Sequence, residues 1–153
     1  MQQPADDQIT ITHLPTTNDQ VIIEALFLQS IPEQLFAYWT TPTLICRWWP
    51  TEAAIEPQSG GTYHFSWPKM QWHLRGRYVE FIPNEKLIFT WQWDHEPETA
   101  EKQVAVTFEP YVDGGTQLRI THTAYTNSPA DQEVRAGHIE GWLHFLTQLQ
   151  NVV

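Results

Sequence analysis

The sequence has little positive charge. Only 8 Lys and Arg side chains stand against 18 Asp and Glu, which gives a formal net charge of −10 at pH 7. Proteins that bind nucleic acids or anionic membrane surfaces do so largely by placing basic side chains against phosphate groups. This composition therefore argues against nucleic acid as a partner and against electrostatic docking on membranes. It leaves neutral or cationic partners open.

The sequence also has a single cysteine and no long apolar run. With only Cys46, no disulfide can form within the chain, as expected in a reducing compartment. No uninterrupted apolar stretch approaches the ~20 residues of a membrane-spanning helix. The first ten residues, MQQPADDQIT, are polar and acidic, unlike a secretory signal. We therefore expect a cytoplasmic protein with no membrane insertion.

Familiar motifs of metal, cofactor and nucleophile chemistry are missing as well. The seven histidines are scattered and do not form HExxH or another pair at metal-ligand spacing. The sequence contains no GxGxxG, Walker or G-x-S-x-G motif. We therefore predict no metal site, no cofactor and no catalytic residue. Whether the chain catalyses a reaction stays open, and a role without catalysis is favoured.

Aromatic residues are abundant, at 13% of the chain with eight tryptophans. So many large rings need a large aromatic core or a cavity with aromatic walls. The segment TLICRWWP, residues 43–50, places Trp48 and Trp49 side by side near the end of a predicted helix. Adjacent helical residues point about 100° apart, so both rings are not expected to face the same core. We expect one ring to plug the core and the other, taken to be Trp49, to line a cavity entrance or the surface.

In the N-terminal third of the chain, the sequence predicts an arm, a strand and two short helices. Residues 1–19 are expected to form a flexible arm or an edge strand, followed by a single domain over residues 20–153. The β-forming run VIIEALFL, residues 21–28, predicts the first strand of that domain. Ser30 and Glu33 then have the spacing of a capping box, which predicts the start of the first helix.

The second short helix is predicted from Thr41 as its N-cap and Pro42 in its first turn, and it should end near Trp48. About six strands separated by turn residues follow. Alternation places these residues on the inward faces of successive strands: Tyr63, Phe65 and Trp67; Leu87, Phe89, Trp91 and Trp93; Val104, Val106 and Phe108; Leu118, Ile120 and His122.

A long C-terminal helix is predicted to close the domain. Ser128 caps it, with Pro129 in the first turn and Asp131 completing the capping pattern. Its apolar stripe consists of His138, Trp142, Phe145, Leu146 and Leu149. An antiparallel sheet with one wet face must cover its other face, and this helix is the only predicted element long enough. The expected fold is α+β: a curved antiparallel sheet wrapped around a long C-terminal helix, with two short helices after the first strand.

In this order of elements the chain resembles a known family. The resemblance rests on TP before a helix ending in WW, on Gly60-Gly61, on GRYVEFIPNEKLIFTW, and on VTFEP, LRITHT and GHIEGWLHFLTQL. It covers roughly residues 21–149 and points to the family named for the activator of the heat-shock-protein-90 ATPase homologues. That family lies in the START-like, or SRPBCC, superfamily of helix-grip folds. The resemblance implies a deep cavity between the sheet and the last helix.

The residues expected to line this cavity come from several elements. They are Trp49, Tyr63, Phe65, Trp67, Phe89, Trp91, Trp93, His122, His138 and Trp142. His122 stands out because a buried imidazole needs a partner. It is expected to bond a ligand, to act as an acid or base, or to be satisfied by a neighbouring side chain. Gly141 is expected to allow close approach of helix and sheet. Glu80 points inward or outward, depending on a bulge at Gly76.

Three functions follow from these observations. The leading one is binding of a small apolar or aromatic molecule in the cavity. The second is a cyclase- or hydrolase-type enzyme that uses the same cavity, with His122 or a carboxylate as acid or base. The third is a protein-interaction module of co-chaperone type, with a chaperone as partner. A homodimer is also left open by the sequence.

Overall fold

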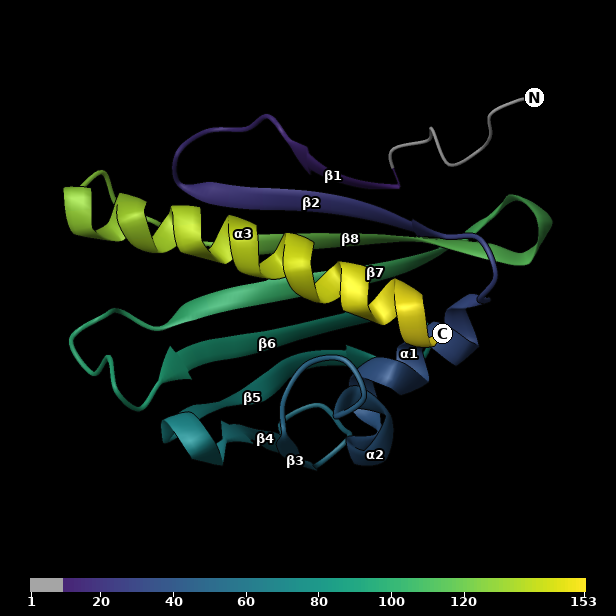
Figure 1. Cartoon of the computed structure of the whole chain (residues 1–153), viewed down its shortest axis with the longest axis horizontal. Coiled ribbons are helices and arrows are strands. Elements are labelled where there is room, and N and C mark those ends of the chain that lie inside the picture. Colours follow the sequence, from purple (N-terminus) through teal and green to yellow (C-terminus); the bar gives the residue numbers. More distant parts are fainter. Residues whose placement is uncertain (1–9) are drawn as a thin grey trace.

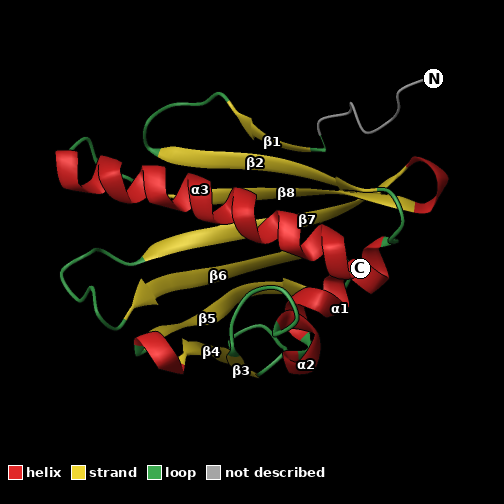
Figure 2. Cartoon of the chain, viewed as in Figure 1, coloured by secondary structure: helices red, strands yellow, loops and turns green. Residues whose placement is uncertain are grey.

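The computed structural model describes residues 10–153 as an eight-stranded antiparallel sheet with helices against one face (Figures 1 and 2). The strands are β1 (Ile11–Leu14), β2 (Gln20–Phe27), β3 (Glu52–Ile55), β4 (Thr62–Trp67), β5 (Trp72–Ile82), β6 (Lys86–Trp93), β7 (Lys102–Tyr111) and β8 (Gly115–Thr123). The helices are α1 (Pro32–Thr40), α2 (Pro42–Ile45) and α3 (Pro129–Val152). Short 3-10 turns occupy Pro68–Met70 and Val112–Gly114. The strand order across the sheet is β1-β2-β8-β7-β6-β5-β4-β3.

The long helix α3 lies along one face of the curved sheet, over the half that contains β2, β8 and β7, as Figure 1 shows. The short helices α1 and α2 lie near one end of the same face. This arrangement confirms the predicted α+β helix-grip fold with two short helices after the first long strand. Among the described residues, no helix combines the length and apolar character needed to cross a bilayer.

The inward faces of the strands are those that alternation predicts. In β6, β7 and β8 the buried positions include Phe89, Val104 and His122. These three residues are aligned across the sheet, because Phe89 pairs with Val104 and Val104 pairs with His122. Side chains on one sheet face repeat every second residue, so this register brings every predicted inward residue of these strands to the helix side.

The start of α1 differs from the predicted capping box. The N-cap position is Ile31, and its amide donates to the side chain of Gln34 at 3.3 Å. Ser30 is buried instead, and its carbonyl accepts a hydrogen bond from Oγ1 of Thr116 at 2.6 Å. Ser30, the cap predicted from the local sequence, therefore contacts β8 instead of capping α1. The predicted cap of α3 is confirmed, since Oγ of Ser128 accepts from the Asp131 amide at 3.1 Å.

Strand β5 is continuous through Gly76 and has no bulge there. A side chain at Gly76 would meet the carbonyl oxygen of Thr90 at 2.3 Å, so glycine is required there for close packing of β5 on β6. The bulge lies further on, between Tyr78 and Glu80. It turns Glu80 outward, where the carboxylate pairs with Lys86 at 2.9 Å. This resolves the orientation of Glu80 and removes it from the cavity.

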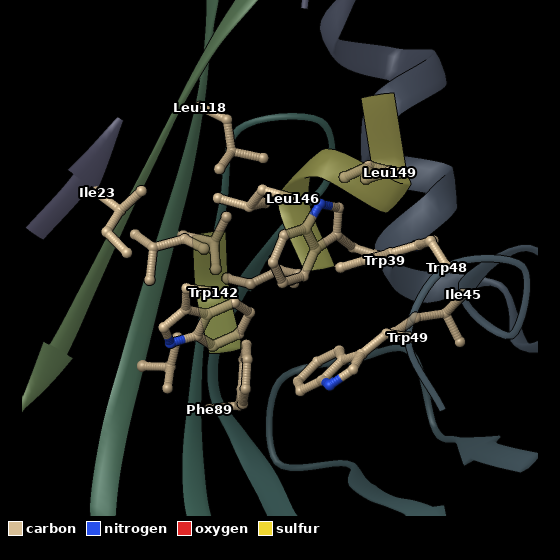
Figure 3. Close-up of a cluster of buried hydrophobic side chains, with 14 of the residues drawn as sticks. Ile23, Trp39, Ile45, Trp48, Trp49, Phe89, Leu118, Trp142, Leu146 and Leu149 are labelled. Atoms are coloured by element: carbon tan, nitrogen blue, oxygen red, sulfur yellow. The ribbon is translucent and has the colours of Figure 1, made fainter. Parts of the chain in front are cut away.

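We predict that replacing Leu146 by alanine lowers the free energy of unfolding by about 2–5 kcal/mol. The Leu146 side chain is fully buried between α3 and the sheet (Figure 3). Urea unfolding followed by circular dichroism measures the change. The matched control is Gln148→Ala on the exposed side of the same helix, expected to change stability by less than about 0.5 kcal/mol. Equal effects of the two substitutions would contradict the assigned core.

Candidate functional site

A pocket of about 280 Å³ lies between α3 and the strands β4, β5 and β6. Eight of its lining residues are aromatic or methionine, two are glycines and one is histidine. The lining residues are Trp49, Trp67, Met70, Trp72, Trp91, Trp93, Gly137, His138, Gly141, Trp142 and Phe145. No carboxylate and no basic side chain other than His138 lines this pocket. Its walls are therefore apolar and aromatic.

The adjacent Trp48 and Trp49 are both buried, but only Trp49 lines the pocket, whereas Trp48 packs in the core. Trp48 packs on Trp39 with ring centroids 4.8 Å apart, and its indole N–H donates to the Tyr38 carbonyl at 2.8 Å. Trp49 lines the pocket and contacts Trp142 at 5.2 Å. Figure 3 shows Trp49 and Trp142 reaching into the space between the short helices and the sheet.

The expectation that both rings do not face the same core is wrong. Trp48 and Trp49 stack on each other at 5.6 Å with an interplanar angle of 29°. Helix α2 ends at Ile45, so both tryptophans lie in the turn that follows and the helical angle between neighbours does not apply.

The structure brings six of the ten predicted site residues to the pocket: Trp49, Trp67, Trp91, Trp93, His138 and Trp142. The other four lie outside it. Tyr63, Phe65 and Phe89 pack together in the core, where they leave no open volume. The Tyr63 hydroxyl is already committed, because it donates to the Thr90 carbonyl at 2.6 Å.

His122 lies directly behind His138. The two imidazoles stack with centroids 4.4 Å apart and planes within 7°. Nδ1 of His122 accepts a hydrogen bond from the indole N–H of Trp142 at 3.0 Å. Because indole is only a donor, this bond places the single proton of neutral His122 on Nε2. Burial, with the nearby His138 and Lys102, lowers the pKa of His122 well below its usual range, so the ring is neutral at pH 7.

His138 is oriented by a phenol. The Tyr125 hydroxyl lies 2.7 Å from Nδ1 of His138, and burial raises the pKa of Tyr125 so that it keeps its proton. We assign the phenol as the donor to Nδ1, which places the imidazole proton on Nε2. Burial and the charge of Lys102 lower the pKa of His138 to about 4.

A buried ion pair supports this cluster. Lys102 is 4% exposed, and its Nζ donates to Asp131 at 3.1 Å and to the Ala124 carbonyl at 2.8 Å. The ammonium also lies over the Tyr125 ring, 4.5 Å from its centroid. Sequence reasoning missed this lysine, although Lys102 falls in the inward register of Val104, which was a usable signal.

The pocket also includes residues that the sequence analysis did not assign to it: Met70, Trp72, Gly137, Gly141 and Phe145. From the sequence, Gly141 was expected to allow a close approach of helix and sheet. The structure shows no such approach. A Cβ atom built at Gly137 or Gly141 would meet nothing within 4 Å. The two glycines instead leave open the side of α3 that faces the pocket. Within residues 10–153, no three His, Cys, Asp or Glu side chains converge in a way that could hold a metal ion.

Comparison with known proteins gives a consistent set of relatives. Residues 29–153 match the family model described as "Activator of Hsp90 ATPase homolog 1-like protein". The mouse activator of 90 kDa heat shock protein ATPase homolog 2 is 28% identical over 88 residues, which cover 58% of this chain and 25% of the mouse protein. The human homolog 1 is 24% identical over 126 residues, which cover 82% of this chain and 34% of the human protein. The matched segments span 25% and 34% of the length of these two relatives. A crystal structure of a protein from Mesorhizobium loti superposes with a TM-score of 0.75 at 25% identity, covering 86% of this chain and 94% of that one.

We predict that acidification destabilises the fold through His138. The unfolded chain binds a proton at this histidine below about pH 6.5, whereas the folded state resists protonation until about pH 4. The unfolded state therefore binds more protons between these values, and stability falls as the pH falls through this window. The contribution of His138 is on the order of 3 kcal/mol by pH 4. Urea unfolding between pH 7 and pH 4.5 measures it.

His138→Gln keeps an acceptor for Tyr125 but does not titrate, so it should reduce this dependence to the part that His122 contributes, since burial also lowers the pKa of His122. The control is His144→Gln, at an exposed position of the same helix, which should retain the dependence of the original protein. The assignment fails if the two variants lose stability in parallel.

Proposed function

The chain belongs to the Activator of Hsp90 ATPase homolog 1-like family, and from that premise we propose that it binds a small apolar or aromatic molecule in the pocket between α3 and β4–β6. The match confirms the family resemblance noted from the sequence. Family membership alone does not assign a ligand or a reaction, because one fold hosts many functions. The proposal rests on the pocket itself.

The observation that carries the proposal is the aromatic lining of a pocket that the core leaves open. Small-molecule sites are concave and mostly apolar, with a few polar groups that orient the ligand. Six tryptophans and Phe145 supply the apolar surface here, and His138 supplies a polar group. Large flat rings around a narrow space favour a flat ligand, because stacked or edge-to-face contacts then form on several sides.

The polar groups support binding more strongly than proton transfer. A general acid or base works best when its pKa lies near the working pH. The pKa of His138 is about 4, and that of Tyr125 is raised by burial, so neither exchanges a proton readily near pH 7. The partly buried carboxylate of Asp131 is bonded to Lys102 instead of to a histidine. The alternative of a cyclase or hydrolase therefore has less support than a binding role.

We predict that Gly141→Leu weakens binding of naphthalene by at least about ten-fold, or ~1.4 kcal/mol. The new side chain would enter the pocket and displace two or more methylene-sized contacts, each worth about 0.8 kcal/mol. Equilibrium dialysis with chromatographic quantification measures the dissociation constant. The control is Ala136→Leu, which adds similar bulk at an exposed position of the same helix.

Gly141→Leu should melt at or above the temperature of the original protein, because leucine favours a helix more than glycine does. Ala136→Leu should melt close to that temperature, because alanine and leucine are both strong helix formers. The proposal is wrong if naphthalene binds neither to the original protein nor to the control. It is also wrong if the Gly141 variant binds as tightly as the original protein.

A second candidate function is binding to a chaperone, which is the co-chaperone alternative from the sequence analysis. The family name and an apolar surface favour it. Leu28, Ile31, Tyr111 and Val112 are all exposed, and Val112 is 66% exposed. They lie where the β2–α1 connection meets the β7–β8 turn (Figure 1). An apolar surface at one end of a domain is a common feature of protein-binding sites.

The corresponding prediction concerns the ATPase rate of a purified heat-shock protein 90. If this surface docks on the chaperone, adding the chain should raise that rate, and Val112→Asp should abolish the increase. Exposed Thr43→Asp on α2 is the charge-matched control and should retain it. An unchanged rate with the original chain would rule out this candidate without affecting the pocket.

A further inference from the structure

Three N–H groups beside the pocket have no hydrogen-bond acceptor among residues 10–153. The indole N–H of Trp91 and Nε2 of His122 are both buried without a partner. Nε2 of His138, whose ring lines the pocket, makes no hydrogen bond within the described residues either, since its bond to Tyr125 uses Nδ1. Buried donors in native proteins are nearly always paired, so the unpaired N–H groups of Trp91 and His122 need an explanation.

All three groups are donors and none is an acceptor. Indole nitrogen only donates. In both histidines Nδ1 is occupied as an acceptor, from Trp142 in one case and from Tyr125 in the other. The remaining proton of each neutral imidazole is therefore on Nε2.

The three rings form one cluster. The centroid of Trp91 lies 4.7 Å from that of His122 and 5.4 Å from that of His138, and the two imidazoles are 4.4 Å apart. Trp91 and His138 line the pocket, and His122 lies behind them. The rings that carry these donors are thus gathered at one wall of an otherwise apolar pocket.

The charges around this wall favour a neutral acceptor. The positive charge of Lys102 is already compensated by Asp131 at 3.1 Å. An anion would have to leave water without a free cation to balance it, which is costly. A cation would find aromatic faces, but it would also find three donors and no carboxylate among the lining residues.

We propose that the pocket binds a planar aromatic molecule carrying a neutral carbonyl oxygen, and that this oxygen accepts hydrogen bonds from Trp91 and His138. The inference deepens the function proposed above and rests on it. The tryptophan walls hold the ring system by stacking, and the donors select the oxygen. His122 is a positioning residue, because its stacking on His138 fixes the plane of that imidazole.

The test compares two naphthalenes of nearly equal shape. 2-Acetylnaphthalene carries a carbonyl oxygen, whereas 2-isopropenylnaphthalene has a CH₂ group in its place. A pocket without free donors would prefer the alkene, because the ketone must give up its hydrogen bonds to water. We expect the ketone to bind about ten-fold more tightly, by equilibrium dialysis at pH 7, because a site with buried donors discriminates against a ligand that leaves them unpaired.

Two tryptophan variants show whether the preference comes from the donors. Trp91→Phe removes one of the two proposed donors and should lower the preference for the ketone from about ten-fold to about three-fold, because the His138 donor remains. Trp93→Phe removes a similar area of pocket wall but leaves the donor cluster intact. It should weaken both probes while keeping the ketone preferred by about ten-fold. Circular dichroism confirms that each variant is folded, and the comparison in the original protein needs no variant at all.

The outcomes separate this inference from the proposed function. Equal binding of both probes, or tighter binding of the alkene, overturns the carbonyl inference while the aromatic pocket stands. Tighter binding of trimethyl(2-naphthyl)ammonium than of the ketone overturns it in favour of a cation site. If no naphthalene binds, the proposed function has failed and the inference fails with it.

Discussion

A single helix has to cover the concave face of an eight-stranded sheet, and the helix is too narrow to do so. A helix is about 10–12 Å across with its side chains, whereas eight strands spaced at about 4.8 Å span roughly 34 Å. Helix α3 therefore seals only the side near β2, β8 and β7, where Leu146 and Leu149 are fully buried (Figure 3). The other side is closed by α1 and by the turn that carries Trp48 and Trp49. The pocket lies where these two covers fail to meet.

The two halves of α3 are attached to the sheet by different physical means. The C-terminal half is held by apolar packing of Leu146 and Leu149. The N-terminal half is held by polar contacts, in which Asp131 pairs with the buried Lys102 of β7 and His138 stacks on His122 of β8. Buried charges and imidazoles are tolerated only when they have partners. The polar half therefore fixes the position of the helix at the level of the pocket.

The sequence predicts the fold well because the fold depends on patterns of burial. Strict alternation in β6, β7 and β8 and the stripe on α3 are enforced by one continuous core, so they can be read without coordinates. Local signals were less reliable where a tertiary contact competed with them. Ser30 has the sequence of a cap, but its carbonyl is bonded to Thr116 of a distant strand. The expected angle of about 100° between Trp48 and Trp49 does not apply, because α2 ends after a single turn, before both residues.

The site was less predictable than the fold, since inward register does not separate a packed core from a pocket wall. Phe89 and Trp91 lie on the same face of the same strand, yet only Trp91 reaches the pocket. That distinction depends on which α3 residues face each strand position. Opposite Trp91 these include the small residues Gly137 and Gly141, which leave space open. The expectation for Gly141 shows the difficulty, because a conspicuous glycine in a helix suggested close packing where the structure has open space.

The glycines of α3 are the strongest reason to regard the pocket as more than a defect in packing. Gly137 and Gly141 are one helical turn apart, so both lie on the same side of the helix, and both line the pocket. Each destabilises a helix interior by roughly 0.5–1 kcal/mol relative to alanine. Space would allow a larger residue at both positions, since a Cβ atom there meets nothing within 4 Å. A helix whose only role was to cover the sheet would gain stability and buried area from larger side chains at both places. The chain instead keeps the turn of α3 opposite its tryptophans free of side chains, as expected if something other than the protein fills that space.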